Sequence, residues 1–417
     1  MKPSVNALAG VKVLDLTRFL AGPFCTQLLS DHGADVAKVE PFEGDQARAF
    51  GLPPGVNEGD DGQYSLYFQS INRNKRSLAL DLRRDEGKEV LRRMVAGADV
   101  LVENFRLGVM ERLGLGYEQL REINPRLVYA AVRGFGDTRS GESPYSEWPC
   151  FDIIAQSTGG LLSITGDPDG TPTKVGPGIG DTLPGIYLAF GILAALHQAT
   201  RTGKGQFVDV CMTDAILAIS ERVVYHYQLS GRSPKPEGNF HPFFCPYGLY
   251  RAADGWVSIA CVSSGFWQKL AQIIGKPELG TRPDLQTDSQ RSAQRDFVNA
   301  QVTEWTRGQT KKQLAEALGG IIPFGSVNTA EDIFADRHFQ RREMLVEVES
   351  MGKGAKPLTL VNTPVKMSDT PSHVPTRAPF LGEHTVGLLA EYGFAQQEID
   401  DLLGRGAVRR SAQEEPR

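Results

Sequence analysis

The sequence feature best suited to chemistry is a glycine-rich turn that ends in an aspartate. Residues Gly176–Asp181 read GPGIGD, and the apolar run that follows predicts a helix over Asp181–Thr200. Aspartate is a preferred N-cap residue, so Asp181 is expected to cap this helix. Unpaired N–H groups and the helix dipole would also keep this carboxylate ionised. It could then attack an activated carbonyl, with nearby N–H groups stabilising the oxyanion.

Two short basic segments are candidates for holding an anionic ligand. Asn72–Ser77 contains Lys75 and Arg76, and Asn104–Arg106 follows a predicted strand. Ligands of parallel sheets bind outside the carboxyl ends of the strands, so the second segment is expected in the crevice. Arg112 follows one helical segment later. Each cation could be an ordinary solvated surface residue, and together they could hold phosphates.

Several other chemistries are disfavoured. Glu40 ends a predicted strand where dinucleotide-binding folds place a ribose-binding acid, but the turn Thr17–Pro23 has no GxGxxG. NAD binding is therefore not expected, and Glu40 is interpreted as an exposed carboxylate at a strand end. His241 and His384 have no HxxxH or HExxH partner, so no metal site is expected. With 45 basic and 50 acidic residues, the net charge of −5 argues against nucleic-acid binding.

The elements that must position these residues alternate between strand and helix through the first half of the chain. One helix is expected from Gly22 to His32 and a second over Asp85–Ala96. The predicted strands are Val11–Leu16, Val36–Glu40, Ser77–Leu82, Asp99–Phe105 and Leu127–Val132. This alternation predicts an α/β fold whose parallel sheet has helices on both faces.

The second half predicts a smaller α+β module. It is preceded by one long predicted helix, Thr213–Leu229, with Thr213 as its cap, and by a polar linker at Gly231–Gly238. A hairpin is expected around Ala253–Gly255. The other predicted elements are helices at Phe151–Thr158, Phe266–Ile274, Ser289–Arg307, Lys311–Leu318, Glu383–Tyr392 and Gln397–Leu403, and a strand at Phe207–Met212.

Composition indicates a cytoplasmic protein with no membrane partner. The longest apolar stretch, Leu183–Leu196, is too short to span a bilayer and is expected to be a core helix. The cysteines are scattered without CxxC spacing, which fits a reducing compartment. They are Cys25, Cys150, Cys211, Cys245 and Cys261.

The order and spacing of several short segments resemble the family III CoA-transferases, the CaiB/BaiF group that includes formyl-CoA transferase. The resemblance runs from Leu8 to about Val408. It is carried by Gly10–Asp15, Ala21–Pro23, Gly33–Glu40, Asn74–Ser77, Val102–Phe105, Ile123–Leu127, Gly180–Asp181, Arg201–Gln206 and Leu381–Thr385. Each segment is weak alone, whereas their joint order is specific.

The resemblance implies a Rossmann-like large domain built from both chain ends, a small α+β domain and a dimer of interlocked subunits. Residues 1–205 would form the N-terminal part of the large domain, and 206–240 a helix and linker. Residues 241–325 would form the small domain, and 326–417 the return linker and the C-terminal part of the large domain. A homodimer is expected, and a hetero-oligomer stays open.

The resemblance also implies the reaction. The family's catalytic aspartate corresponds to Asp181, which would attack an acyl-CoA thioester to form a mixed anhydride. The CoA thiolate would return to give an aspartyl-CoA thioester, which the acceptor acid attacks. CoA is thus a substrate, and no permanently bound cofactor is expected. The expected CoA contacts are Phe19, Leu20, Asn104, Phe105, Arg112, Lys75 and Arg76.

Two departures from the formyl-CoA transferase type bear on the acceptor. Leu20 stands where that type has Gln, and Phe240–Pro246 stands where it has a four-glycine loop. Formate and oxalate are therefore disfavoured, and a larger dicarboxylic, aromatic or branched acid is expected. Its candidate contacts are Asp152, His241, Phe243 and Phe244.

Two alternatives are weighed against transfer. An α-methylacyl-CoA racemase needs two acid/base groups across the α-carbon. The racemases have a His where this chain has Phe151, before an acid that matches Asp152. Phenylalanine cannot transfer a proton, which disfavours racemisation. A non-catalytic CoA-binding partner subunit is disfavoured by the intact Asp181.

Overall fold

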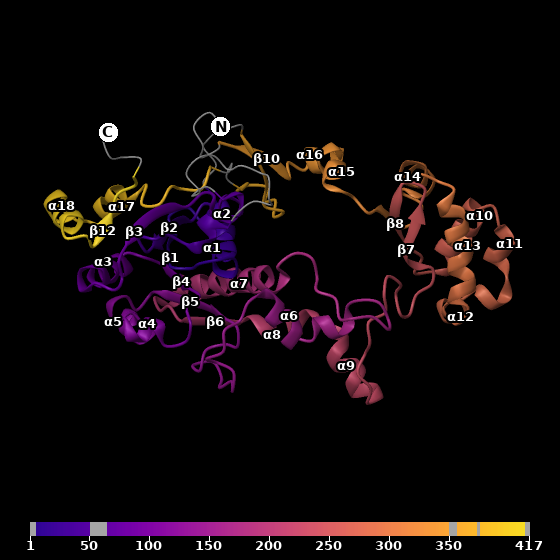
Figure 1. The fold of residues 1–417 in the computed structure, drawn as a ribbon, viewed down its shortest axis with the longest axis horizontal. Coiled ribbons are helices and arrows are strands. Elements are labelled where there is room, and N and C mark those ends of the chain that lie inside the picture. The colour runs from indigo at the N-terminus through magenta and orange to yellow at the C-terminus, as the bar shows by residue number, and fades with distance from the viewer. Residues whose placement is uncertain (1–5, 51–64, 350–356, 373–375, 413–417) are drawn as a thin grey trace. The chain divides into compact units, whose positions relative to one another are not determined.

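The computed structural model describes residues 6–50, 65–349, 357–372 and 376–412. The chain divides into two units (Figure 1). Unit 1 comprises Met1–Leu161, Val175–Val224 and Gln340–Arg417, and unit 2 comprises Leu162–Lys174 and Tyr225–Phe339. Leu162–Lys174, which lies within the expected N-terminal part of the large domain, belongs to unit 2, and the chain re-enters unit 1 at Gln340, within the expected return segment.

A seven-stranded sheet forms the centre of unit 1. Across the sheet lie β12 (Val408–Arg409), β3 (Arg76–Leu80), β2 (Asp35–Glu40), β1 (Lys12–Asp15), β4 (Val100–Glu103), β5 (Val128–Arg133) and β6 (Phe207–Cys211). All neighbours pair in parallel except β12, which runs antiparallel to β3. The order β3-β2-β1-β4-β5-β6 is that of a doubly wound sheet, in which a crevice opens beyond the carboxyl ends of β1 and β4.

Helices cover both faces of this sheet, which confirms the predicted α/β architecture. Successive strand residues face opposite sides, so Val13 and Leu14 enter different cores. One face is covered by α1 (Ala21–Asp31), α6 (Asp152–Thr158), α7 (Ile179–Thr202) and α8 (Met212–Ile219). The other is covered by α3 (Asp85–Val95), α4 (Val109–Arg112), α5 (Tyr117–Ile123), α17 (Thr385–Glu391) and α18 (Gln396–Gly404).

The α7 helix is the one described helix that could cross a membrane by length and composition. Its residues Leu188 and Ile192 pack in one core with Cys25 and Leu29 of α1. This packing agrees with the core helix expected from the sequence.

Two predicted helices are each split into two. The expected helix Thr213–Leu229 is divided at Ser220 into α8 and α9 (Glu221–Ser230). Ser220 leaves the helical conformation, and its hydroxyl donates to the carbonyl of Ile216 at 2.9 Å. Thr213 is not a cap but lies inside α8. The expected helix Ser289–Arg307 is divided at Gln294 into α12 (Asp288–Ala293) and α13 (Arg295–Arg307).

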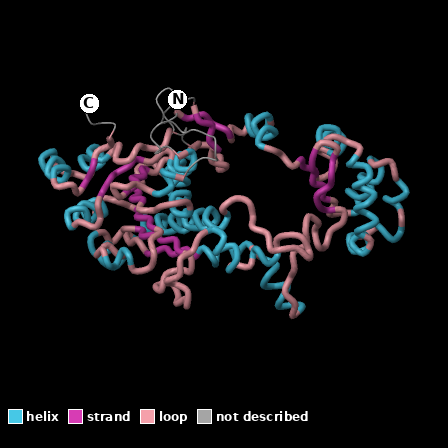
Figure 2. Tube along the Cα trace, in the orientation of Figure 1, coloured by secondary structure: helices cyan, strands magenta, loops and turns pink. Residues whose placement is uncertain are grey.

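Unit 2 contains a three-stranded antiparallel sheet with helices packed on one side (Figure 2). Strands β7 (Tyr247–Ala252) and β8 (Gly255–Ala260) form the predicted hairpin, and β9 (Phe324–Ser326) pairs with β8. Its helices include α10 (Ser264–Ile273), α11 (Pro277–Thr281), α12, α13, α14 (Lys311–Leu318) and α15 (Ala330–Ala335). The remaining elements of the described chain include α2 (Leu66–Asn72), α16 (Arg337–Arg341), β10 (Leu345–Val348) and β11 (Leu358–Val361).

Candidate active site

Asp181 lies in the first turn of α7, as its third residue. The N-cap position is Gly178, so the expectation that Asp181 caps the helix is wrong. The capping contact comes from another helix instead. Oδ1 of Asp152, the first residue of α6, accepts the N–H of Gly180 at 2.8 Å. The carboxylate of Asp181 is therefore not used for capping.

Asp152 is held in this role by the buried side chain of Gln156. Nε2 of Gln156 donates to Asp152 Oδ1 at 2.8 Å, and its Oε1 accepts the N–H of Val175 at 3.0 Å. A Cβ atom at Gly180 would lie 2.5 Å from the backbone oxygen of Asp152. Glycine at this position thus allows α6 and the start of α7 to approach closely.

The two aspartates share one small region, and this shifts the pKa of the nucleophile candidate. Asp181 Oδ2 and Asp152 Cγ lie 3.7 and 3.9 Å from the position that a Cβ at Gly178 would take. Burial, and then the negative charge of Asp152, raise the pKa of Asp181 to about 7. Within the described parts of the chain, no hydrogen bond or ion pair satisfies the Asp181 carboxylate. Burial therefore outweighs the expected ionising effect of the helix terminus.

The backbone N–H groups at the start of α7 are already paired. Gly180 donates to Asp152, and Asp181 and Thr182 both donate to the carbonyl of Gly178, at 3.1 and 2.9 Å. The N–H of Ile179 bonds to the carbonyl of Pro177 at 2.8 Å. The expected oxyanion site at these N–H groups is therefore occupied by intramolecular bonds.

Apolar and aromatic side chains surround the two carboxylates. Cδ2 of Leu20 lies 3.1 Å from the Cβ position of Gly178, and Phe19 meets Phe151 edge to face at 5.7 Å between ring centroids. Burial, and then the negative charge of Asp181, raise the pKa of Tyr67 to about 12. The structure thus brings Phe19, Leu20, Asp152 and Asp181 together.

A second group of expected contacts follows β4. Asn104 Oδ1 accepts the N–H of Arg18 at 2.9 Å, and its Nδ2 donates to the carbonyl of Arg18 at 2.7 Å. The Arg18 guanidinium lies 5.3 Å from the centroid of the Phe105 ring. Arg112 ends α4, and its exposed guanidinium has no acidic partner among the residues described. This edge therefore offers cations to an anionic ligand.

Lys75 and Arg76 do not join this group. The side chain of Lys75 is fully buried, and its Nζ contacts Asp15 Oδ2, the carbonyl of Pro23 and Asn72 Oδ1 at 2.9–3.0 Å. Arg76 begins β3, and its guanidinium pairs with Asp35 at the start of β2, which is the amino edge of the sheet. Both cations stabilise the fold where they lie.

Glu40 is also placed differently from expectation. Its carboxylate is 1% exposed and pairs with Arg48, with Oε1–Nε and Oε2–Nη2 distances of 2.8 and 2.7 Å. Burial opposes ionisation, but Arg48 lowers the pKa of Glu40 to about 2. The interpretation of Glu40 as an exposed strand-end carboxylate is therefore wrong.

The aromatic segment expected to contact the acceptor belongs to unit 2. Nδ1 of His241 accepts the N–H groups of Phe243 and Phe244 at 3.1 and 3.3 Å. The imidazole stacks on Tyr247 at 4.8 Å between ring centroids. The role of these residues in acceptor binding stays a prediction.

A cavity of about 700 Å³ also lies in unit 2, and it contains none of the predicted site residues. Its lining is Pro168, Glu237, Phe240, Arg295, Asp296, Asn299, Ala300, Thr303, Glu304 and Arg307. No group of three or more His, Cys, Asp or Glu in the described ranges could hold a metal ion.

Sequence reasoning missed four residues of the site. Arg18 and Tyr67 carry no motif, since a cation in a turn and an aromatic in a helix are common. Gln156 contacts Asp152, four residues earlier on α6, and this spacing was the available signal. Asp45 lies five residues beyond β2, and it contacts Lys38 of that strand and the N–H of Phe19, which is 26 residues earlier in the chain.

Comparison with known proteins decides the family. Residues 8–385 match the family model of CoA-transferase family III. The chain belongs to this family. It is 46% identical over 390 residues to a succinyl-CoA:mesaconate CoA-transferase of Haloarcula marismortui, covering 93% of this chain and 97% of the relative. It is 38% identical to a succinate–glutarate CoA-transferase of Agrobacterium fabrum, covering 92% of this chain and 95% of the relative.

A solved structure extends the similarity to the fold. A CaiB/BaiF family protein from Brucella suis superimposes with a TM-score of 0.81 at 38% sequence identity. The match covers 93% of this chain and 99% of that protein. The expected family, enzyme class and mixed α/β architecture are thereby confirmed: this chain is a family III CoA-transferase.

Proposed function

We propose that this CoA-transferase moves CoA from an acyl-CoA, such as succinyl-CoA, to a dicarboxylic acid, with Asp181 as the nucleophile. The observation that carries the proposal is the Asp181 carboxylate, which is half-buried beside Asp152 without a partner among the described residues. An unpaired, partly buried carboxylate costs stability, and such costs are typical of reaction centres. The relatives' names specify mesaconate and glutarate, which supports a dicarboxylic acceptor.

In the first half-reaction, an Asp181 oxygen attacks the thioester carbonyl carbon of the donor. The carbon–sulfur bond breaks, CoA leaves as its thiolate, and a mixed anhydride remains. The thiolate then attacks Cγ of Asp181, the carbon–oxygen bond to that carbon breaks, and the donor acid leaves as a carboxylate. The product is an aspartyl-CoA thioester, and no proton is gained or lost overall.

In the second half-reaction, the acceptor carboxylate attacks Cγ of Asp181 and displaces the CoA thiolate. The thiolate attacks the acyl carbon of the new anhydride, which releases the Asp181 carboxylate and the new acyl-CoA. Retaining the thiolate beside Asp181 keeps its effective concentration high. Binding of the long CoA moiety supplies the energy that orients the reacting groups.

CoA is proposed to lie along the carboxyl edge of β1 and β4. Phe19, Leu20 and Phe105 would border its apolar parts, and Arg112 with Arg18 would face its phosphates. Asn104 would act through Arg18, because both ends of its amide bind that residue's backbone. Lys75 and Arg76 are left out of this proposal, since their cations are paired within the fold. Asp152 would act on Asp181 rather than on the acceptor.

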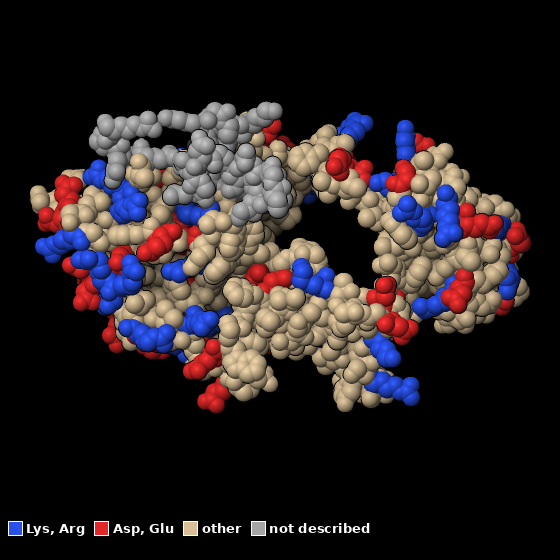
Figure 3. Space-filling view, in the orientation of Figure 1, with Lys and Arg blue, Asp and Glu red and all other residues tan. Residues whose placement is uncertain are grey.

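A dimer is proposed as the functional form. Several exposed apolar residues lie on three neighbouring helices: Ile153 and Ile154 on α6, Ile186, Tyr187, Phe190 and Leu193 on α7, and Leu217 on α8. Single exposed apolar residues are ordinary, whereas a group of them on adjacent helices is typical of an interface. Figure 3 shows few charged side chains over α6 and α8. Sedimentation should give twice the chain mass, and Phe190→Glu should favour the monomer.

The nucleophile is tested by trapping the covalent intermediate. After incubation with succinyl-CoA, intact mass should show a CoA adduct on the wild-type chain, and hydroxylamine should convert Asp181 to its hydroxamate. Asp181→Ala should show neither adduct nor transfer. Full transfer by Asp181→Ala would disprove the assignment.

The acceptor is tested by a screen of mesaconate, glutarate, aromatic and branched acids against succinyl-CoA, read by chromatography of the CoA products. Dicarboxylic acids should be preferred. Deuterium exchange at the substrate α-carbon in heavy water would instead indicate racemisation. A wild-type chain that binds CoA without forming an adduct would indicate a non-catalytic subunit.

A further inference from the structure

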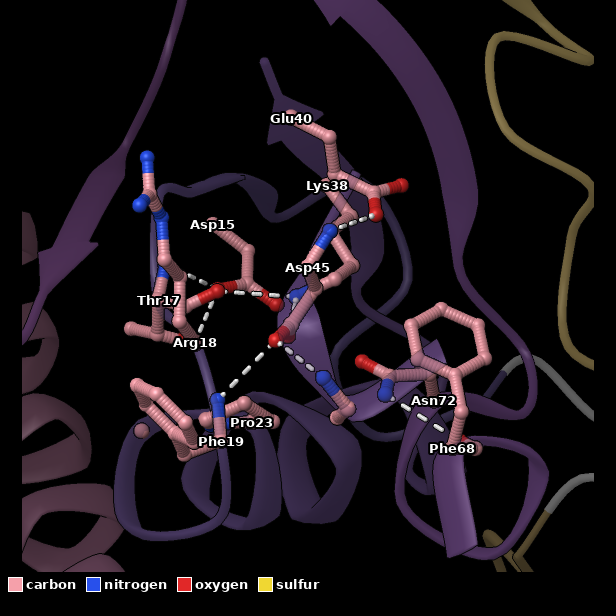
Figure 4. A network of polar contacts seen from close by, with 12 residues as sticks. Asp15, Thr17, Arg18, Phe19, Pro23, Lys38, Glu40, Asp45, Phe68 and Asn72 are labelled. Atoms are coloured by element: carbon pink, nitrogen blue, oxygen red, sulfur yellow. Dashed lines mark hydrogen bonds and ion pairs between the residues drawn. The ribbon is translucent and has the colours of Figure 1, made fainter. Parts of the chain in front are cut away.

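The turn that links β1 to α1 is held by side chains from three separate segments. The carbonyl of Thr17 accepts from Lys38 Nζ at 2.8 Å, and both backbone polar groups of Arg18 bind Asn104. The N–H of Phe19 donates to Asp45 Oδ1 at 3.2 Å. Figure 4 shows Asp45 pointing toward the backbone of Phe19. Three consecutive residues are therefore each tied to a side chain from outside the turn.

Lys38 and Asp45 also bind each other, so two of these hydrogen-bonding side chains are linked. Lys38 Nζ lies 3.1 Å from Asp45 Oδ2, and both side chains are fully buried. Burial disfavours the charged ammonium, but the charges of Asp45 and Asp15 raise the pKa of Lys38 above its usual value. Asp45 Oδ1 also accepts the N–H of Ala47 at 3.0 Å. A buried ion pair of this kind needs such additional contacts to offset the cost of desolvation.

The turn is held in a conformation that phenylalanine does not favour. Phe19 has φ of 63°, in the left-handed region where residues with a Cβ are strained by about 1–2 kcal/mol. Such strain persists only where the surrounding structure imposes it, and it is typical of functional sites. The bonds from Asp45 and Asn104 supply that constraint.

The strained turn places two side chains beside the nucleophile. Immediately after it, Leu20 reaches to 3.1 Å from the Cβ position of Gly178, three residues before Asp181. The ring of Phe19 packs against Phe151, which precedes Asp152. A change in the Phe19 backbone would therefore move the apolar wall around both carboxylates.

We propose that Asp45, paired with Lys38, is a positioning residue for CoA transfer that holds the Phe19–Leu20 turn against the start of α7. This inference rests on the proposed function, because it assigns Asp45 a role in the reaction of Asp181. Asp45 itself contacts no reacting atom. It acts through the backbone of Phe19.

The test compares Asp45→Ala with Asp31→Ala as a matched control. Asp31 is an equally buried carboxylate at the far end of α1, paired with Arg73 at 2.7 Å, and it does not touch the turn. Both variants lose a buried ion pair and should melt at lower temperature than the wild type. Asp45→Asn is the milder variant, because its single oxygen cannot serve both Lys38 and the N–H of Phe19.

Two readouts separate positioning from stability. Hydrogen exchange of the peptide 16–21 should become faster in Asp45→Ala and stay unchanged in Asp31→Ala. The kcat/KM for succinyl-CoA, per active site counted from the CoA adduct by intact mass, should fall on the order of 10- to 100-fold in Asp45→Ala. It should stay within about twofold of wild type in Asp31→Ala, and Asp45→Asn should change in the same direction as Asp45→Ala.

The outcomes distinguish this inference from the proposed function. If the Asp45 variants keep wild-type kcat/KM per active site, or if Asp31→Ala loses as much, the positioning role is wrong while the nucleophile assignment stands. If the wild-type chain forms no CoA adduct, the proposed function fails and this role fails with it.

Discussion

Replacing Asp152 by asparagine should lower the pKa of Asp181 and shift the pH dependence of CoA transfer. Asparagine keeps an oxygen for the N–H of Gly180 and for the amide of Gln156, both now 2.8 Å from Asp152 Oδ1. The start of α7 should therefore stay in place, and the negative charge alone is lost. Because like charges disfavour ionisation, removing one favours the anionic form of Asp181.

The size of the shift follows from the geometry. Asp181 Oδ2 and Asp152 Cγ lie 3.7 and 3.9 Å from one point beside Gly178, so they are at most about 8 Å apart. At that separation and an effective dielectric constant of about 20, two like charges repel by about 2 kcal/mol, or about 1.5 pKa units. Solvent at this half-buried site weakens the repulsion, so we expect the pKa of Asp181 to fall by about one unit from its value of about 7.

The assay is kcat/KM for the donor acyl-CoA as a function of pH, which reports ionisations of the free enzyme. In the proposed reaction the ionised Asp181 carboxylate is the nucleophile, so kcat/KM should rise with pH to a plateau. Its midpoint should lie near pH 7 in the wild type and near pH 6 in Asp152→Asn. Glu118→Gln, which neutralises an exposed acid on α5, should leave the midpoint unchanged. An unchanged or higher midpoint in Asp152→Asn would refute the reasoning.

Three further predictions concern stability and packing. Asp181→Asn should raise the free energy of unfolding by up to about 4 kcal/mol at pH 8 and hardly change it at pH 4, as measured by urea unfolding. The reason is that a carboxyl whose folded pKa is raised to about 7 destabilises the fold only at pH values above its unfolded pKa, where it ionises. Equal gains at both pH values would contradict this. Asp15→Asn leaves Lys75 buried without its anion and should cost about 3–5 kcal/mol at pH 7. Since the folded pKa of Asp15 is about 2, the contribution of its carboxylate to the stability of the wild type should disappear as pH falls from 4 to 2. A stability difference between the wild type and Asp15→Asn that does not change over this pH range would contradict the prediction. Gly180→Ala should abolish formation of the CoA adduct, because its Cβ would lie 2.5 Å from the backbone oxygen of Asp152. The chain should stay folded, as checked by circular dichroism. Normal adduct formation would show that α6 and α7 can separate without loss of the reaction.

Local sequence patterns predicted a helix, strand or turn well where the residues of that segment alone determine its structure. The hairpin expected around Ala253–Gly255 forms, because a turn signal between two apolar runs is a local property. The helix expected over Thr213–Leu229 is split at Ser220, because a buried serine hydroxyl bonds back to the preceding turn there. Burial of that serine depends on distant residues, which local patterns do not contain.

Paired charges were the least predictable part of the site. Lys75 looked like a phosphate contact, yet its partner Asp15 lies 60 residues earlier in the chain. Glu40 looked exposed, yet Arg48 and Ser77 enclose it. A charged residue has the same identity whether it binds a ligand or a neighbour, so only the folded arrangement separates the two.

The sequence by itself determined the family and the alternation of strands and helices, and it singled out Asp181 as the proposed nucleophile, since all three depend on residue order along the chain. Tertiary structure decided how that carboxylate behaves. The cap of α7 comes from Asp152 on another helix, and the apolar side chains beside Asp181 come from a turn held by Asp45. The raised pKa of Asp181 comes from its burial and from the charge of Asp152. These are effects of distance and solvent exclusion, which exist only once remote segments have packed together.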